Sequence, residues 1–148
     1  VIALLGLAGA ALTAPLALAD YGPPEAAPGA IASAKSQAKD AKRAVLLVFG
    51  ADWCKDCRVL EAEMTKPALA ARLAARYQVV KVNVGRFDRN TDLAERYGVP
   101  LKKGIPALAV IAPDDQVLAA TAAGELASAR SMSSQGISTF LLGLPQAK

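Results

Sequence analysis

Apolar and polar residues form two patterns along this chain, and each pattern predicts a different kind of element. Residues 45–49 form a continuous run of aliphatic and aromatic side chains that is too short for a helix, so it predicts a buried strand. Similar runs predict strands over residues 79–84 and 107–112. A turn at residues 113–116 then predicts a hairpin whose second strand covers residues 117–122.

Helical spacing of apolar residues predicts the segments between these strands. The alanine-rich residues 30–44 have a narrow apolar face. Residues 124–131 fit either one helical turn or a loop. The order of elements predicts an α/β fold with a central mixed sheet of about four strands, two parallel and then an antiparallel pair, flanked by helices. Four further helical patterns occur at residues 58–64, 68–77, 92–97 and 133–142.

The start of the chain predicts export. Residues 1–19 are apolar and uncharged, and they end in an A-x-A cleavage pattern, so we interpret them as a secretory signal peptide. The alternative is a retained N-terminal membrane anchor, because a segment of this length could just span a bilayer. The proline-rich residues 20–29 predict a flexible, extended lead-in to a domain over residues 30–148. Export would place the protein in the periplasm or another oxidising compartment.

The composition narrows the classes of function. The net charge is +4, but cations and acids are interspersed and no basic stripe carries aromatics, so we expect no nucleic-acid partner. The chain has no histidine, so proton transfer near neutral pH would fall to thiols, carboxylates or lysines. With only two cysteines there is no framework of structural disulfides, and a zinc site of about four ligands cannot be completed. We expect neither a metal nor a cofactor.

The two cysteines form a Cys-x-x-Cys motif between the first strand and the next helix. This arrangement indicates redox chemistry, because the unpaired N–H groups at a helix N-terminus stabilise a thiolate. We expect the pKa of Cys54 to lie below the value of about 8.5 for a free thiol. Cys57 follows one helical turn later, which predicts Cys54 as the attacking thiol and Cys57 as the resolving thiol. The other interpretations are a local structural disulfide and half of a metal site.

The two residues between the cysteines have opposed effects. Lys55 favours the Cys54 thiolate, and Asp56 opposes a nearby anion. A two-electron potential changes by about 30 mV for about 1.4 kcal/mol, so charges of this kind can shift the couple in either direction. The direction of electron flow stays open on these grounds.

Residues 49–57, with the sequence FGADWCKDC, resemble the thioredoxin superfamily, in particular its bacterial exported thioredoxin-like branch. Residues 79–84 are similar to the family's next parallel strand. Residues 97–99 and 104–108 are similar to the segment that carries the family's cis-proline. The resemblance covers roughly residues 30–142 and implies a thioredoxin-like fold.

The resemblance also implies roles for individual residues. Trp53 would lie beside the disulfide and provide contact area for a partner. Pro106 would follow a cis peptide bond, and Ile105 would offer its backbone to a substrate peptide in strand-like hydrogen bonds. Lys81 resembles a lysine that lies beneath the active site in thioredoxins.

The chain departs from the family pattern at two places. The family has a buried aspartate six residues before the first cysteine, the proposed proton acceptor for the resolving thiol, and Val48 occupies that position here. Cys57 would then lose its proton through water, Asp56 or Glu61. In addition, about three extra residues around positions 100–102 precede the Ile-Pro dipeptide.

The sequence therefore predicts a thiol–disulfide oxidoreductase that acts on protein disulfides, as a reductase or isomerase outside the cytoplasm. We expect a monomer that exchanges with protein thiols and disulfides and receives electrons from a membrane-embedded or soluble thiol donor. The alternative is a non-enzymatic thioredoxin-fold module for partner binding or metal delivery. The expected site comprises catalytic Cys54 and Cys57, substrate-binding Trp53, Ile105 and Pro106, and supporting Lys55, Asp56 and Lys81.

Overall fold

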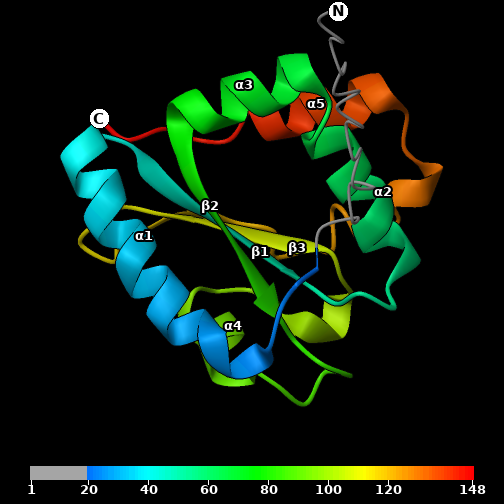
Figure 1. Ribbon diagram of the computed structural model, residues 1–148. Helices are drawn as coiled ribbons and strands as arrows, with labels where there is room; N and C mark the ends of the chain where they lie inside the picture. Colours follow the sequence, from blue (N-terminus) through cyan, green and yellow to red (C-terminus); the bar gives the residue numbers. More distant parts are fainter. Residues whose placement is uncertain (1–19) are drawn as a thin grey trace, which may run out of the picture.

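The computed structural model describes residues 20–148, which form a mixed sheet with helices on both faces (Figure 1). The predicted signal peptide or anchor, residues 1–19, lies outside the described residues. Among residues 20–148, no helix is both long and apolar enough to cross a membrane.

The sheet has four strands in the order β2-β1-β3-β4. β1 runs parallel to β2 and antiparallel to β3, and β3 and β4 form the predicted hairpin. Every residue of β1 is buried, as expected for a continuous apolar run covered on both faces. The predicted mixed four-stranded sheet is thus confirmed. The strand bounds are β1 (Ala44–Gly50), β2 (Tyr77–Asn83), β3 (Ala107–Ile111) and β4 (Val117–Ala120).

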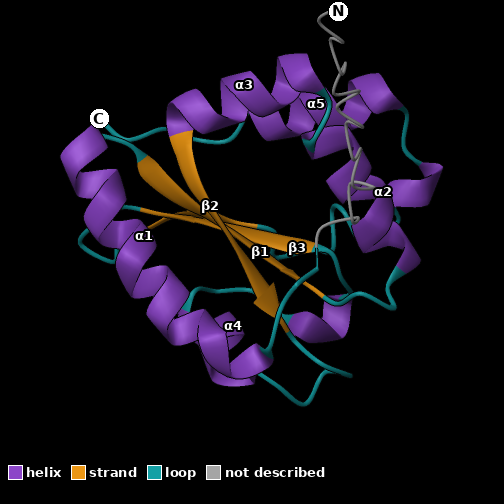
Figure 2. Ribbon diagram, in the orientation of Figure 1, coloured by secondary structure: helices purple, strands orange, loops and turns teal. Residues whose placement is uncertain are grey.

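Five α-helices of the described residues cover the two faces of this sheet (Figure 2). One face carries α1 (Ala27–Ala41) and α4 (Thr91–Arg96). The other face carries α2 (Lys55–Met64), α3 (Pro67–Arg76) and α5 (Ser134–Leu142). Residues 20–148 also contain three short 3-10 helices: η1 (Pro24–Ala26) directly before α1, η2 (Leu101–Lys103) and η3 (Ala129–Ser131).

The helix boundaries differ from the predicted ones by a few residues, for local reasons. α1 ends at Ala41 because Lys42 adopts the left-handed conformation, with φ of 53°, and β1 already begins at Ala44. The Ser133 hydroxyl accepts a hydrogen bond from the Gly136 N–H, which confirms the predicted cap of the last helix. The ambiguous residues 124–131 form turns and η3.

The structure differs from the sequence-based expectation at residues 20–29. Instead of an extended lead-in, residues 24–26 form η1 and α1 begins at Ala27. Prolines are well tolerated in the first turn of a helix, so their number here does not exclude helical structure. Residues 20–24, which we call the N-terminal strap, pack against the domain, so the packed part of the chain begins before residue 30.

The ends of β1 and β2 hold the N-terminal strap. Tyr21 is 7% exposed and covers Gly50, where a Cβ would lie 2.3 Å from the tyrosine hydroxyl oxygen. The Tyr21 N–H donates to the Asp52 carboxylate at 3.0 Å. The Asn83 side-chain amide donates to the Gly22 carbonyl at 2.7 Å. These contacts join residues far apart in the sequence, so the local composition gave no sign of them.

Asp115, in the turn between β3 and β4, ties the hairpin to α1 and α4. Its carboxylate accepts hydrogen bonds from the Lys35 ammonium at 3.0 Å and the Tyr97 hydroxyl at 2.9 Å, and it pairs with Arg96. Burial alone would raise the pKa of Asp115, but these hydrogen bonds and the charges of Lys35 and Arg96 lower it overall. Burial and then Asp115 raise the pKa of Tyr97 to about 12, so its hydroxyl stays protonated and donates.

Replacing Tyr21 by alanine should lower the free energy of unfolding by about 3 kcal/mol, because truncating a buried aromatic side chain leaves a cavity. Urea denaturation measures this loss. The exposed neighbour Glu25 provides the control, since Glu25→Ala should change stability by less than about 0.5 kcal/mol. Equal effects of the two substitutions would show that the N-terminal strap is not packed.

Replacing Asp115 by asparagine should lower stability by roughly 1–2 kcal/mol at pH 7, since hydrogen bonds to a charged group are lost. The folded-state pKa of Asp115 is lowered, so its contribution is present above the unfolded pKa of about 3.9 and is lost as the pH falls through the folded value. The stability difference between wild type and Asp115→Asn should therefore shrink in acid. A constant difference between pH 7 and pH 2 would contradict this assignment.

Candidate active site

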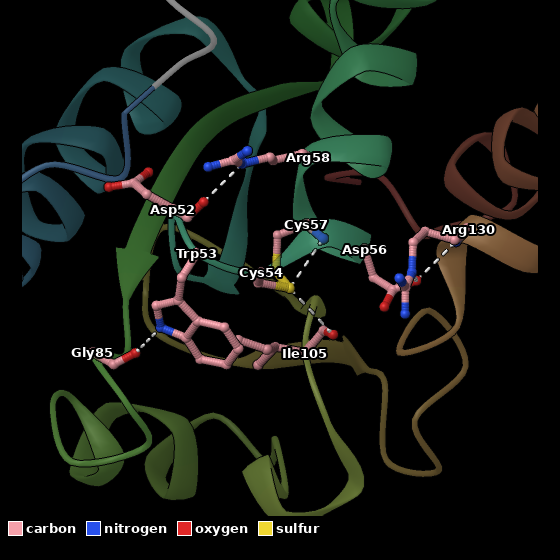
Figure 3. Close-up of a disulfide and its surroundings, with 9 residues drawn as sticks. All are labelled: Asp52, Trp53, Cys54, Asp56, Cys57, Arg58, Gly85, Ile105 and Arg130. Atoms are coloured by element: carbon pink, nitrogen blue, oxygen red, sulfur yellow. Dashed lines mark hydrogen bonds and ion pairs between the residues drawn. A yellow bond between two sulfur atoms is a disulfide. The ribbon is translucent and has the colours of Figure 1, made fainter.

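The two cysteines lie at the start of α2, just after the end of β1 (Figure 3). Cys54 and Cys57 are joined by a disulfide, with 5.2 Å between their Cα atoms. Cys54 occupies the N-cap position, and its sulfur accepts a hydrogen bond from the Cys57 backbone N–H at 3.1 Å. Cys54 is 5% exposed and Cys57 is 1% exposed, so the first cysteine is the outer one. A negative charge on the Cys54 sulfur would be stabilised by that N–H and by the helix dipole.

A short turn between β1 and α2 brings Cys54 to this position. Gly50 ends the buried strand, and the Cys54 N–H donates to the Ala51 carbonyl at 3.1 Å. The Arg58 guanidinium of α2 reaches back and donates to the Asp52 carbonyl at 2.8 Å. The turn is therefore fixed from both the strand side and the helix side.

Trp53 lies on the surface beside the disulfide and is 43% exposed. Its indole N–H donates to the Gly85 carbonyl at 2.8 Å, so the loop after β2 holds the ring in place. The Arg86 guanidinium lies over this ring at 5.5 Å, and the Phe87 ring meets it edge-on at 5.9 Å. The loop at residues 85–90 thus borders the active-site face, where the sequence places it.

The loop before β3 lies against the cysteines. The Ile105–Pro106 peptide bond is cis, as the family resemblance implies, and the Ile105 carbonyl oxygen is 3.7 Å from the Cys54 sulfur. Gly104 has a φ of 102°, and a Cβ there would lie 2.8 Å from the Ala127 Cβ, so only glycine fits without strain. A cleft of about 460 Å³ opens over Cys54 beside this loop.

The two residues between the cysteines have different surroundings. Lys55 is exposed at the first position of α2. Asp56 accepts a hydrogen bond from the Arg130 backbone N–H at 2.8 Å and pairs with its guanidinium at 3.3 Å (Figure 3). Arg130 therefore offsets part of the negative charge that Asp56 places near Cys54.

Lys81 of β2 pairs with a carboxylate from α2. In the parallel ladder, Lys81 is the register partner of Val48, the position at which the family has its buried aspartate. Its ammonium is 2.7 Å from a Glu61 carboxylate oxygen, and both side chains are largely buried. Glu61 lies four residues after Cys57, on the same face of α2. Glu61 of α2 thus provides the carboxylate that the family has on the central strand.

A cavity of about 280 Å³ brings Glu61 together with the inner cysteine, since Cys57, Glu61, Asp52 and Tyr21 all contribute to its lining. Burial first, and then the charges of Glu61 and Asp52, raise the pKa of Tyr21. Its hydroxyl therefore stays protonated at neutral pH, and its ring lies 5.6 Å from the Lys81 ammonium. The N-terminal strap therefore lines the same cavity as the inner cysteine.

Sequence reasoning missed several residues of the site. Arg130 is 74 positions from its partner Asp56, and no local pattern connects them. Tyr21 lies in a segment whose proline-rich composition is typical of a linker. Phe87 is an aromatic residue within a polar loop, a signal that could have been used.

Comparisons with known proteins agree with this geometry. A family model described as thioredoxin-like matches residues 26–113. The structure is similar to the crystal structure of a disulphide isomerase from Xylella fastidiosa Temecula1, with a TM-score of 0.75 and 43% identity, over 78% of this chain and 88% of that chain. It also resembles the oxidised C-terminal domain of DsbD from Neisseria meningitidis in fold, with a TM-score of 0.52 and 21% identity, over 69% of this chain and 84% of that chain.

Two curated proteins are similar in sequence over shorter lengths. The thiol:disulfide interchange protein DsbD 1 from Pseudomonas aeruginosa is 33% identical over 88 residues, which are 58% of this chain and 14% of that protein. A thioredoxin from Buchnera aphidicola is 33% identical over 69 residues, which are 47% of this chain and 56% of that protein. The chain therefore spans less than two thirds of the length of either curated relative.

Proposed function

This chain belongs to the thioredoxin-like family, and from that premise we propose that it is a thiol–disulfide oxidoreductase acting on protein disulfides outside the cytoplasm, as a reductase or an isomerase. The observation that carries the proposal is the Cys54 sulfur at the N-cap of α2, which accepts a hydrogen bond from the Cys57 N–H and faces the Ile105 carbonyl. The relatives named disulphide isomerase and thiol:disulfide interchange protein support the same chemistry.

The reaction begins with the reduced pair of thiols. The Cys54 thiolate attacks one sulfur of the client disulfide, so the client S–S bond breaks and one client thiolate leaves. The Cys57 thiolate then attacks the Cys54 sulfur of the mixed disulfide and releases the second client thiolate. Two electrons have passed to the client, and the product is the Cys54–Cys57 disulfide present in the structure. A membrane-embedded or soluble thiol donor reduces it for the next turnover.

The surroundings of the sulfurs support binding of a polypeptide client. The exposed Trp53 ring and the cleft over Cys54 provide an accessible surface around the outer sulfur. Among the described residues, no hydrogen bond engages the Ile105 N–H, so this group is available to a client backbone in strand-like pairing. Trp53, Ile105 and Pro106 are therefore proposed as the client-binding residues, and Lys55 and Asp56 as residues that tune the stability of the thiolate.

Glu61 is the proposed proton acceptor for Cys57. Asp56 is engaged by Arg130 on the surface, whereas Glu61 lines the same cavity as Cys57. The Lys81 ammonium holds the Glu61 carboxylate at 2.7 Å and compensates its charge. This arrangement replaces the strand aspartate of the family with a carboxylate one helical turn after the resolving cysteine.

The proposed activity is tested by catalysis of insulin reduction with dithiothreitol as the donor. Wild type should accelerate the reaction, and Cys54→Ala should not. Cys57→Ala should accumulate mixed disulfides with clients, because the attacking thiol remains and the resolving thiol is gone. Trapping by Cys54→Ala instead would reverse the two roles. Client binding by a wild type that does not catalyse reduction would favour the non-enzymatic binding module.

Replacing Glu61 by glutamine should slow the resolving step about tenfold or more at pH 7. A positioned general base contributes at most about 10²–10⁴-fold to the rate, which sets the upper limit of the effect. The measurement is single-turnover decay of the mixed disulfide between about pH 5 and about pH 9, a range that includes neutral pH. Glu63→Gln is the matched control, since Glu63 is on the same helix but pairs with Lys66 and Ser134. Coincident pH profiles for Glu61→Gln and wild type would exclude Glu61 as the acceptor.

A further inference from the structure

The loop after β2 holds Phe87 in a backbone conformation that a bulky residue rarely adopts. Its φ is 67°, in the left-handed region that favours glycine and asparagine. Gly85 and Asn90 in the same loop also have positive φ, but there the residue type suits the conformation. Strain of this kind persists only where the surrounding structure enforces it, and it gathers at functional sites.

Hydrogen bonds at the end of β2 enforce this conformation. The Val84 carbonyl accepts from the N–H groups of residues 87, 88 and 89 at 2.9, 3.2 and 3.2 Å. The Phe87 side chain is consequently 44% exposed, with its ring edge-on to Trp53. The hydrophobic core gains little from an aromatic residue in this position, so its contribution has to be sought at the surface.

Phe87 lines two neighbouring hollows, one of which lies over Cys54. The cleft over Cys54 and a larger hollow of about 900 Å³ both include Phe87 and Gly104 in their linings. The larger hollow lies between α4 and η2, the turn formed where the chain has its extra residues. Its lining is mostly apolar and includes Val99, Pro100 and Leu101. An apolar surface is thus continuous with the reactive site.

We propose that this larger hollow binds an apolar side chain of the client, two residues away from the cysteine that Cys54 attacks, and that Phe87 selects such clients. The inference rests on the oxidoreductase function proposed above and names its substrate class. In an extended client paired with the Ile105 loop, alternate side chains point to the same side. When the client cysteine lies over Cys54, the side chain two positions away faces the same surface of the protein.

The lining fits an apolar occupant better than a charged one. Lys102 and Glu95 both contribute to the hollow, and their opposite charges give it no preference for either sign. A charged client side chain would lose hydration against the apolar wall without a fixed partner, whereas an aromatic ring would gain buried area. The hollow should therefore favour large apolar residues and reject aspartate.

Peptide binding, followed through the fluorescence of the chain's single tryptophan, Trp53, tests the proposal. The probes carry serine in place of the reactive cysteine, and phenylalanine, alanine or aspartate two residues before or after it. The oxidised wild type should bind a phenylalanine peptide about tenfold more tightly than the alanine peptide in one of the two arrangements. Phe87→Asn should reduce this preference to about twofold or less. Asparagine suits a positive φ, so this variant should keep or raise the wild-type Tm.

Val117→Asn is the matched control, because Val117 is 40% exposed and pairs with Ile111 at the end of β3 away from the active site. It should retain the full preference. No preference in wild type, or a preference that survives in both Phe87→Asn and Phe87→Ala, would overturn the inference. Wild-type reduction of bis(2-hydroxyethyl) disulfide is measured in parallel. If the wild type does not reduce this disulfide but keeps the peptide preference, the proposed function would be overturned and the client-binding hollow would stand.

Discussion

The hydrogen bond from the Cys57 N–H to the Cys54 sulfur is the interaction on which the site depends. It exists because β1 ends at Gly50, a short turn follows, and α2 starts with Cys54 as its N-cap. The buried strand fixes the position of the turn, and the unpaired N–H groups of the first helical turn provide the donors. The Ile105 carbonyl oxygen lies 3.7 Å from the same sulfur, and the loop at residues 85–90 holds the neighbouring Trp53 ring (Figure 3).

The second constraint is the charge of Lys81, whose side chain is largely buried. A largely buried ammonium needs a partner, because an uncompensated buried charge is strongly destabilising. Where the family has an aspartate on the central strand, this chain has Val48, and Glu61 of α2 provides the carboxylate instead. The exchange moves the acid to the helix that carries both cysteines. Glu61 and Cys57 line one cavity, and Tyr21 of the N-terminal strap contributes to the same lining.

The sequence predicted those features that depend on local patterns. The apolar run of β1, the serine cap of α5 and the helix that begins at the Cys-x-x-Cys motif are each contained in a few neighbouring residues. The position of Ile105 against Cys54 came from family resemblance. The N-terminal strap, the Asp56–Arg130 pair and the exposed Phe87 depend on contacts between distant parts of the chain, which neither periodicity nor composition encodes.

Stabilisation of a Cys54 thiolate by the N-terminus of α2 can be measured by ultraviolet titration of that thiolate. The suitable protein is Cys57→Ala, which keeps the backbone N–H of position 57 and has a single thiol. The midpoint should lie clearly below the value of about 8.5 for a free cysteine, and it should return to that value when the same variant is unfolded in urea. A folded-state midpoint at or above about 8.5 would contradict it.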